Sequence, residues 1–137
     1  MMSKKILIVE DDFYIRDLYE RALKKSGYDV SLASDGQEAI EITKTNTFDL
    51  ILLDILLPKV TGIDVLRVLR DPVSTAKDTP IFLITNLGQE DIIKQAFKIG
   101  ADGYLLKARL SPENIADEIA SFFSQNEAVK DNKKPSE

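Results

Sequence analysis

Acidic, hydroxyl and basic side chains stand directly after short apolar runs at separate places in this 137-residue chain. Asp11 and Asp12 follow one run, Asp54 a second, Thr85 a third and Lys107 a fourth. Carboxylates held within a few ångströms of one another do not all stay ionised unless a cation lies between them. A lysine can pair with one carboxylate, and a hydroxyl can donate a hydrogen bond. Together these groups meet the needs of phosphoryl transfer: a nucleophile, a divalent ion and fixed donors.

Each acidic group also has a simpler interpretation when it is taken alone. Asp54 could merely cap a turn. The acids at 10–12 could form the solvated N-terminus of the next helix, where carboxylates interact favourably with the helix dipole. That second interpretation is compatible with a cation site, so the decision depends on whether the fold brings these groups together.

The apolar patterning predicts strands that alternate with helices. Contiguous apolar runs, typical of buried strands, predict strands over residues 5–9, 28–33, 48–53, 81–84 and 103–106. Apolar residues at helical spacing predict helices that begin near residues 13, 36, 62, 89 and 112. This alternation implies an α/β doubly wound fold, with a parallel sheet and helices on both faces. All the polar residues named above then lie at the carboxyl edge of the sheet, where such folds bind ligands.

The composition limits the chemistry. The chain has neither Cys nor His, which excludes disulfides, thiolate catalysis, a Ser-His-Asp triad and imidazole metal sites. Any metal is therefore held by oxygen, which favours Mg²⁺, Mn²⁺ or Ca²⁺. A net charge of −5 argues against direct binding to nucleic acid. No apolar run approaches the roughly 20 residues that span a bilayer, so we expect no membrane contact and a cytoplasmic location.

We expect one domain over residues 1–124 and a disordered polar tail over residues 125–137. The chain is long enough for one hydrophobic core and too short for two comfortable domains. From Gln125 onwards the sequence is polar and has almost no apolar residue, a composition typical of disorder.

The motifs, taken together, resemble the receiver domain of two-component response regulators, in particular its single-domain, chemotaxis-regulator-like form. The motifs are Ile8–Asp12, Leu53–Pro58 with Gly62, Ile84-Thr85 and Tyr104–Lys107. The resemblance covers about residues 4–123. It implies a flavodoxin-like (βα)5 fold with strand order 2-1-3-4-5, and a signalling protein rather than an enzyme.

The resemblance implies a phosphorylation site with a metal ion. Asp54 is the implied phosphoacceptor. Asp11, Asp12 and Asp54, with the backbone carbonyl of Leu56, are the implied ligands of Mg²⁺ or Mn²⁺. Glu10 would face away from the metal or contact it through water.

The resemblance also implies a switch and partners. Thr85 and Lys107 would act beside Asp54 in the transfer, and Thr85 with Tyr104 would change the surface formed by the fourth helix, fifth strand and fifth helix. A sensor histidine kinase or a histidine phosphotransfer protein would donate the phosphoryl group, and an unidentified downstream protein would bind the changed surface. The protein would be a monomer or a weak dimer.

Three positions depart from the family pattern. Asn86 follows Thr85 where the family usually has Ala or Ser, and the apolar Leu56 stands two residues after Asp54. Ala108 follows Lys107 where the family usually has Pro. A cis bond before a residue other than Pro costs about 2.5–4 kcal/mol, so we expect a trans bond or local strain there.

Other functions are weighed against this one. A phosphatase of the haloacid-dehalogenase type needs a second Asp two residues after the first, and Leu56 occupies that position. A dinucleotide site lacks a glycine-rich turn after the first strand. A receiver-like interaction module that works without phosphorylation stays open as the alternative.

Overall fold

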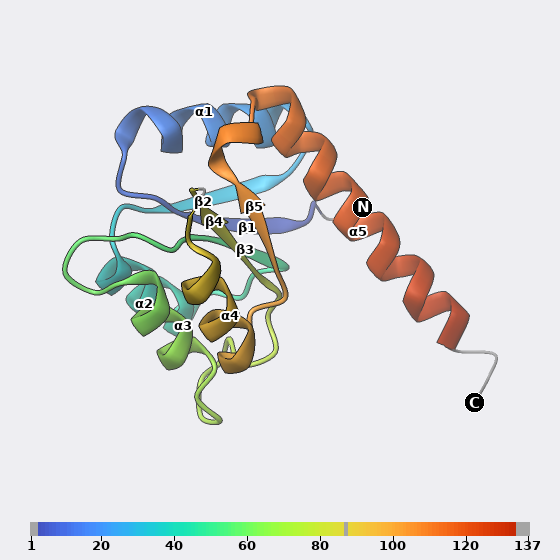
Figure 1. The fold of residues 1–137 in the computed structure, drawn as a ribbon. Helices are drawn as coiled ribbons and strands as arrows, with labels where there is room; N and C mark the ends of the chain where they lie inside the picture. The colour runs from blue at the N-terminus through green and yellow to red at the C-terminus, as the bar shows by residue number, and fades with distance from the viewer. Residues whose placement is uncertain (1–2, 87, 134–137) are drawn as a thin grey trace.

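The computed structural model describes residues 3–86 and 88–133 (Figure 1). Strands and helices alternate along the whole of this part, as predicted. The elements are β1 (Lys5–Val9), α1 (Phe13–Lys25), β2 (Asp29–Ala33), α2 (Gly36–Thr45), β3 (Leu50–Asp54), α3 (Gly62–Leu69), β4 (Ile81–Thr85), α4 (Glu90–Ile99), β5 (Gly103–Leu106), the 3₁₀ turn η1 (Lys107–Arg109) and α5 (Pro112–Lys133).

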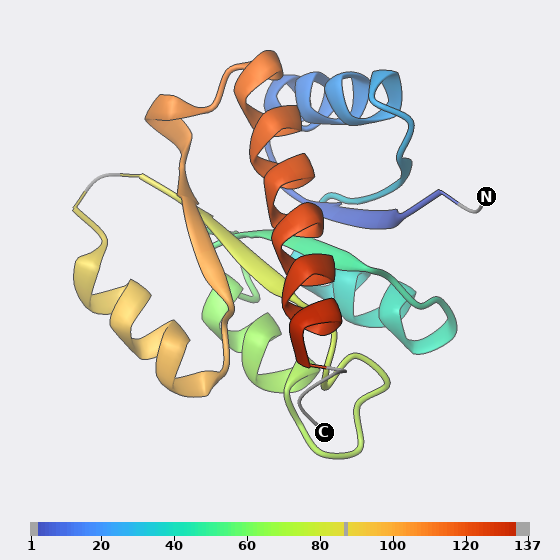
Figure 2. The ribbon, with the colours of Figure 1, turned by 90° about the vertical axis from the view of Figure 1, so that its right-hand side faces the viewer.

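The strands form one parallel five-stranded sheet in the order β2-β1-β3-β4-β5. This is the flavodoxin-like order that the resemblance implied. Helices α1 and α5 cover one face of the sheet, and α2, α3 and α4 cover the other (Figures 1 and 2). The strand order reverses between β1 and β3, and this reversal places the ends of these two strands side by side at the switch point.

Two hydrophobic cores lie on the two faces of the sheet. Because side chains alternate along a strand, Ile6 and Ile8 of β1 pack with α1 and α5, whereas Leu7 and Val9 pack with the other helices. The central strand β3 is buried along its whole length. Its last residue, Asp54, is therefore a carboxylate at the end of an otherwise apolar strand.

The last helix continues further than predicted. We expected a disordered tail from residue 125, but α5 runs to Lys133. Residues 125–133 contain no Gly or Pro and several residues of good helix propensity, including Gln, Glu, Ala and Lys. A polar composition predicts little burial, but it does not by itself oppose a helix that a packed first half has already nucleated. Residues 134–137 lie outside the described residues.

No helix in the described part of the chain combines the length and the apolar character needed to cross a bilayer.

The guanidinium group of Arg70 ties three segments together at the amino edge of the sheet. Arg70 donates to the carbonyl of Gly100 from Nε at 3.0 Å, to the carbonyl of Ala76 from Nη1 at 3.0 Å, and to Asp102 Oδ2 from Nη2 at 2.8 Å. Asp102 Oδ2 also accepts from the backbone N–H of Ile81 at 2.9 Å. The end of α4, the connection before β4 and the start of β5 are thus held by one side chain that is only 12% exposed.

We predict that Arg70→Ala lowers the free energy of unfolding by about 1.5–3 kcal/mol, the range for hydrogen bonds that involve a charged group. Arg67, one turn earlier on α3, is exposed, so Arg67→Ala is the matched control and should change stability by less than about 0.5 kcal/mol. Urea unfolding of both variants checks this prediction. Equal effects of the two substitutions would contradict it.

Candidate functional site

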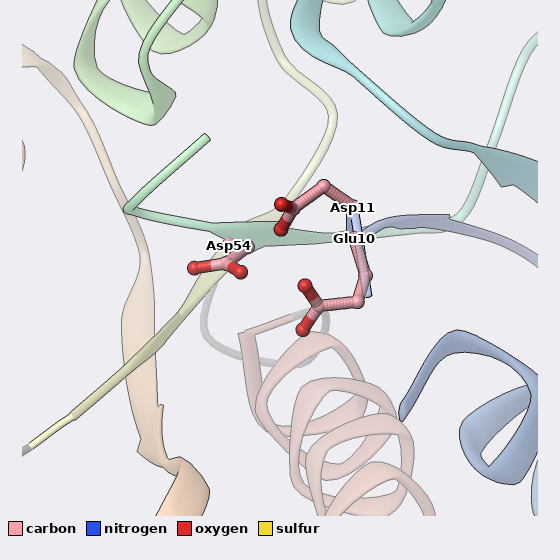
Figure 3. Close-up of side chains that lie close together, drawn as sticks. All are labelled: Glu10, Asp11 and Asp54. Carbon is pink, nitrogen blue, oxygen red and sulfur yellow. The ribbon is translucent and has the colours of Figure 1, made fainter. Parts of the chain in front are cut away.

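Three carboxylates converge at the carboxyl edge of the sheet. Glu10 and Asp11 follow β1, and Asp54 ends β3. Each of them offers an oxygen atom, and these oxygens all lie within 4.8 Å of one another. Figure 3 shows Asp11 on the side of the sheet that carries α2 and α3, and Glu10 on the opposite side, with Asp54 between them. The topology therefore brings together acids from adjacent strands; of the predicted acids, Asp11 and Asp54 are in this group.

Asp54 is held firmly in place. Its side chain is almost fully buried, with Oδ1 accepting from the backbone N–H of Leu56 at 3.0 Å and Oδ2 accepting from Lys107 Nζ at 2.8 Å. The start of α3 packs closely against the end of β3 because Gly62 has no side chain. A Cβ at Gly62 would lie 2.5 Å from the carbonyl oxygen of Asp54. A capping box between Thr61 and Asp64 starts α3 at this glycine. The carboxylate thus has a fixed position and orientation.

Glu10 is fully buried and carries an oxygen with unmet hydrogen-bonding capacity. Its Oε2 accepts from the backbone N–H of Asp12 at 3.3 Å. Its Oε1 lies 3.0 Å from Lys107 Nζ, but no hydrogen bond of good geometry reaches this buried atom from the described residues. Burial raises the pKa of the Glu10 carboxyl from 4.5 to about 8, and the neighbouring Asp54 adds to the rise while Lys107 opposes it.

Lys107 lies between the carboxylates of Glu10 and Asp54. It follows β5 directly, and its side chain is 19% exposed. Burial alone would lower the pKa of the Lys107 ammonium, but the hydrogen bonds and charges of Asp54 and Glu10 outweigh burial and raise it. This lysine therefore stays protonated and neutralises part of the negative charge at the strand ends.

Asp12 does not lie with the other acids, which corrects our prediction that it is a metal ligand. Its carboxylate caps α1, because Oδ1 accepts from the backbone N–H groups of Tyr14 at 2.9 Å and of Ile15 at 3.1 Å. The helix-cap interpretation of the acidic run thus holds for Asp12, and the cation-site interpretation fits Glu10 and Asp11. Both interpretations apply, to different residues.

Sequence reasoning undervalued Glu10. Of the two alternatives given for Glu10, facing away from the site is wrong, because its side chain points toward Asp54 (Figure 3). Contact with the metal through water stays a prediction. A signal was available in the alternation of β1. Glu10 continues the face of Ile6 and Ile8, and Asp11 continues the face of Leu7 and Val9. Because side chains alternate along a strand, these two consecutive acids lie on the two sides of the end of β3.

The remaining predicted residues lie near this edge but make other contacts. Thr85 is buried at the end of β4, and its hydroxyl donates to the carbonyl of Asn86 at 3.2 Å. Tyr104 is 46% exposed and packs edge-on against Phe97, with ring centroids 6.3 Å apart. The bond between Lys107 and Ala108 is trans, one of the two outcomes expected there.

The donor set fits a hard divalent cation. Its carboxylates supply oxygen ligands of the type that Mg²⁺ and Mn²⁺ take. The Oε1 atom of Glu10, which no hydrogen bond of good geometry reaches from the described residues, and the exposed carboxylate of Asp11 leave oxygen atoms that a cation can bind. These residues therefore fit a bound metal ion.

We predict that Asp12→Ala destabilises the metal-free protein by about 0.5–2 kcal/mol, the usual cost of losing an N-cap. Asp12→Asn should leave stability nearly unchanged, because Asn caps helices as well as Asp does. Thermal unfolding in a chelator measures both. If Asp12 instead repelled the other acids, both substitutions would raise the melting temperature.

The raised pKa of Glu10 predicts a pH-dependent stability. Between pH 4.5 and about 8 the folded protein holds a proton on Glu10 that the unfolded chain has released, so the stability of the metal-free protein falls as the pH rises through this window. Glu10→Gln should flatten that fall, whereas the exposed Glu118→Gln should keep the wild-type slope. Urea unfolding at several pH values in a chelator tests this. Parallel curves for wild type and Glu10→Gln would refute it.

Comparison with known proteins agrees with this geometry. A family model for the response regulator receiver domain matches residues 6–120. The transcriptional regulatory protein SrrA of Staphylococcus aureus is 35% identical over 128 residues, which are 93% of this chain and 51% of SrrA. The chain thus spans about half the length of the curated relatives that it matches.

Solved structures show the same fold. The chemotaxis protein CheY4 of Vibrio cholerae is 30% identical with a TM-score of 0.80, covering 88% of this chain and 98% of CheY4. The receiver domain of the sensor histidine kinase PA1611 from Pseudomonas aeruginosa is 26% identical with a TM-score of 0.73, covering 83% of this chain and 92% of that domain. In that structure a magnesium ion is coordinated in the active-site cleft. The described fold, the acidic edge and the family match together establish that this chain belongs to the response regulator receiver domain family.

Proposed function

We propose that this receiver domain accepts a phosphoryl group on Asp54 from a phosphohistidine of a sensor histidine kinase or a phosphotransfer protein. The observation that carries this proposal is the buried Asp54 carboxylate, held by Lys107 Nζ at 2.8 Å and the Leu56 N–H at 3.0 Å. A fixed carboxylate beside further acids and a cationic donor suits attack on phosphorus.

In this step an oxygen of Asp54 forms the new bond to phosphorus while the bond from phosphorus to the donor imidazole breaks. Lys107 holds the carboxylate and donates to negative charge that builds on the transferring oxygens. Glu10, Asp11 and Asp54, with the carbonyl of Leu56, would hold Mg²⁺. When bound, this ion neutralises charge on the phosphoryl oxygens. Asp12 is left out of this set because it caps α1.

The proposed output is a change of the α4–β5–α5 surface. Thr85 and Tyr104 are the proposed switch residues. Among the described residues, the Thr85 hydroxyl donates to the carbonyl of the next residue, Asn86, and a turn of its side chain would direct it toward a phosphoryl group on Asp54. Tyr104 lies half-exposed against Phe97 of α4, which gives its ring space to rotate. An unidentified protein would read this surface, and a cytoplasmic location and a monomeric or weakly dimeric state remain predictions.

We predict that incubation with Mg²⁺ and acetyl phosphate adds one phosphoryl group to the wild-type protein, and that Asp54→Asn and excess chelator each abolish the addition. Intact-mass spectrometry measures it. Asp78→Asn, an exposed acid at the amino edge of the sheet, is the matched control and should react like wild type.

A mass increment that persists in Asp54→Asn would rule out Asp54 as the acceptor. If folded wild type stays unmodified while a known receiver domain reacts in the same tube, the alternative gains support: an interaction module that works without phosphorylation.

A further inference from the structure

Arg16 holds the backbone on which two of the site carboxylates are carried. It lies in the first turns of α1, and its Nη1 donates to the carbonyl of Glu10 at 2.8 Å and to that of Asp11 at 3.4 Å. Its own backbone N–H donates to the carbonyl of Asp12 at 2.9 Å. A side chain of α1 thus binds the backbone of the turn at residues 10–12, which directly precedes this helix.

The two carbonyls that Arg16 binds belong to Glu10 and Asp11, whose side chains supply two of the site carboxylates. Glu10 and Asp11 project to opposite sides of the sheet (Figure 3), and this depends on the backbone dihedrals of the two residues. Because the peptide unit is planar, the ψ dihedral of a residue sets the direction of its carbonyl relative to its Cβ. A donor that fixes both carbonyls therefore restricts where both carboxylates point.

The guanidinium group is itself well placed for this task. It is planar and always charged, so its donors have a fixed relative direction. The Phe13 ring lies 5.7 Å from the guanidinium carbon, a cation–π contact, and Arg16 is partly buried. Phe13 itself is 62% exposed, so its ring packs on the arginine and lies outside the hydrophobic core.

We propose that Arg16 is a positioning residue for the divalent cation: it holds the turn at Glu10 and Asp11 in the conformation that directs both carboxylates toward Asp54. This inference rests on the proposed function, because it takes the cation to bind at these carboxylates. Arg16 acts on the proposed cation site through the backbone carbonyls of Glu10 and Asp11.

Charge and positioning predict opposite effects on cation binding. A positive charge near a cation site weakens binding, so an arginine that acted only by its charge would weaken Mg²⁺ binding, and Arg16→Gln would tighten it. A positioning residue has the opposite effect, because its loss lets the turn adopt conformations in which the carboxylates diverge. The sign of the change therefore separates the two roles.

The test is isothermal titration of Mg²⁺ into the purified chain. We expect Arg16→Gln to raise the Kd by about three- to tenfold, somewhat less than the 10–100-fold typical of partners that bond directly to a ligand group. Arg16→Lys should raise the Kd by a smaller but measurable factor, because its ammonium group can still donate toward one carbonyl but lacks the planar fork that holds both. Arg21→Gln removes the same charge from an exposed site on α1, and it should leave the Kd unchanged or slightly lower.

A second measurement needs no metal. In a chelator, amide hydrogen exchange over residues 9–13 should be faster in Arg16→Gln than in wild type, with the Arg21→Gln control unchanged. A Kd for folded Arg16→Gln equal to or below the wild-type value, or unchanged exchange in this segment, overturns the proposal. If Arg16→Gln does not fold, an unchanged Kd and unchanged exchange in Arg16→Lys overturn it, whereas a raised Kd and faster exchange support it.

The two proposals fail in different ways. If wild type binds no Mg²⁺, the metal-dependent function is wrong, and the exchange measurement alone still decides whether Arg16 holds the turn.

Discussion

The structure at the carboxyl edge depends on one partly buried ammonium group that lies between two acidic side chains. Lys107 Nζ lies 2.8 Å from Asp54 and 3.0 Å from Glu10. Charges taken out of water are costly unless they are paired, and these partners come from the ends of β1, β3 and β5. The contacts of Lys107 with both acids therefore require that these three strands end side by side at the same edge of the sheet. The parallel register of the sheet, in which Asp54 lies opposite Ile84 and Thr85 opposite Leu106, provides this.

Much of the fold could be predicted because its signals are local and repeated. Each buried strand is a contiguous apolar run, and strands β1 and β5 have the predicted bounds. Alternation with helices then predicts a parallel sheet, and the sheet places the polar strand ends at one edge. The positions of Asp54 and Lys107 follow from this reasoning. It needs only that each strand ends within a residue or two of the predicted place.

The acidic run at residues 10–12 shows where such reasoning stops. Which of three consecutive acids turns inward depends on the residue at which β1 ends and α1 begins, and a shift of one residue sends a side chain to the other face. Patterning predicts such boundaries only approximately. The same limit explains α5: polar residues after Phe123 give no packing signal, so composition alone could not distinguish a continuing helix from a tail.

The position of Glu10 and Asp11 on opposite sides of the sheet has a consequence for how the molecule responds to anything bound between them. One acid extends from the strand face that packs with α1 and α5, and the other from the face that packs with α2, α3 and α4. A ligand at the strand ends is therefore linked thermodynamically to both hydrophobic layers at once. Its binding free energy opposes the opening of either layer, so binding would couple the stability of the two cores.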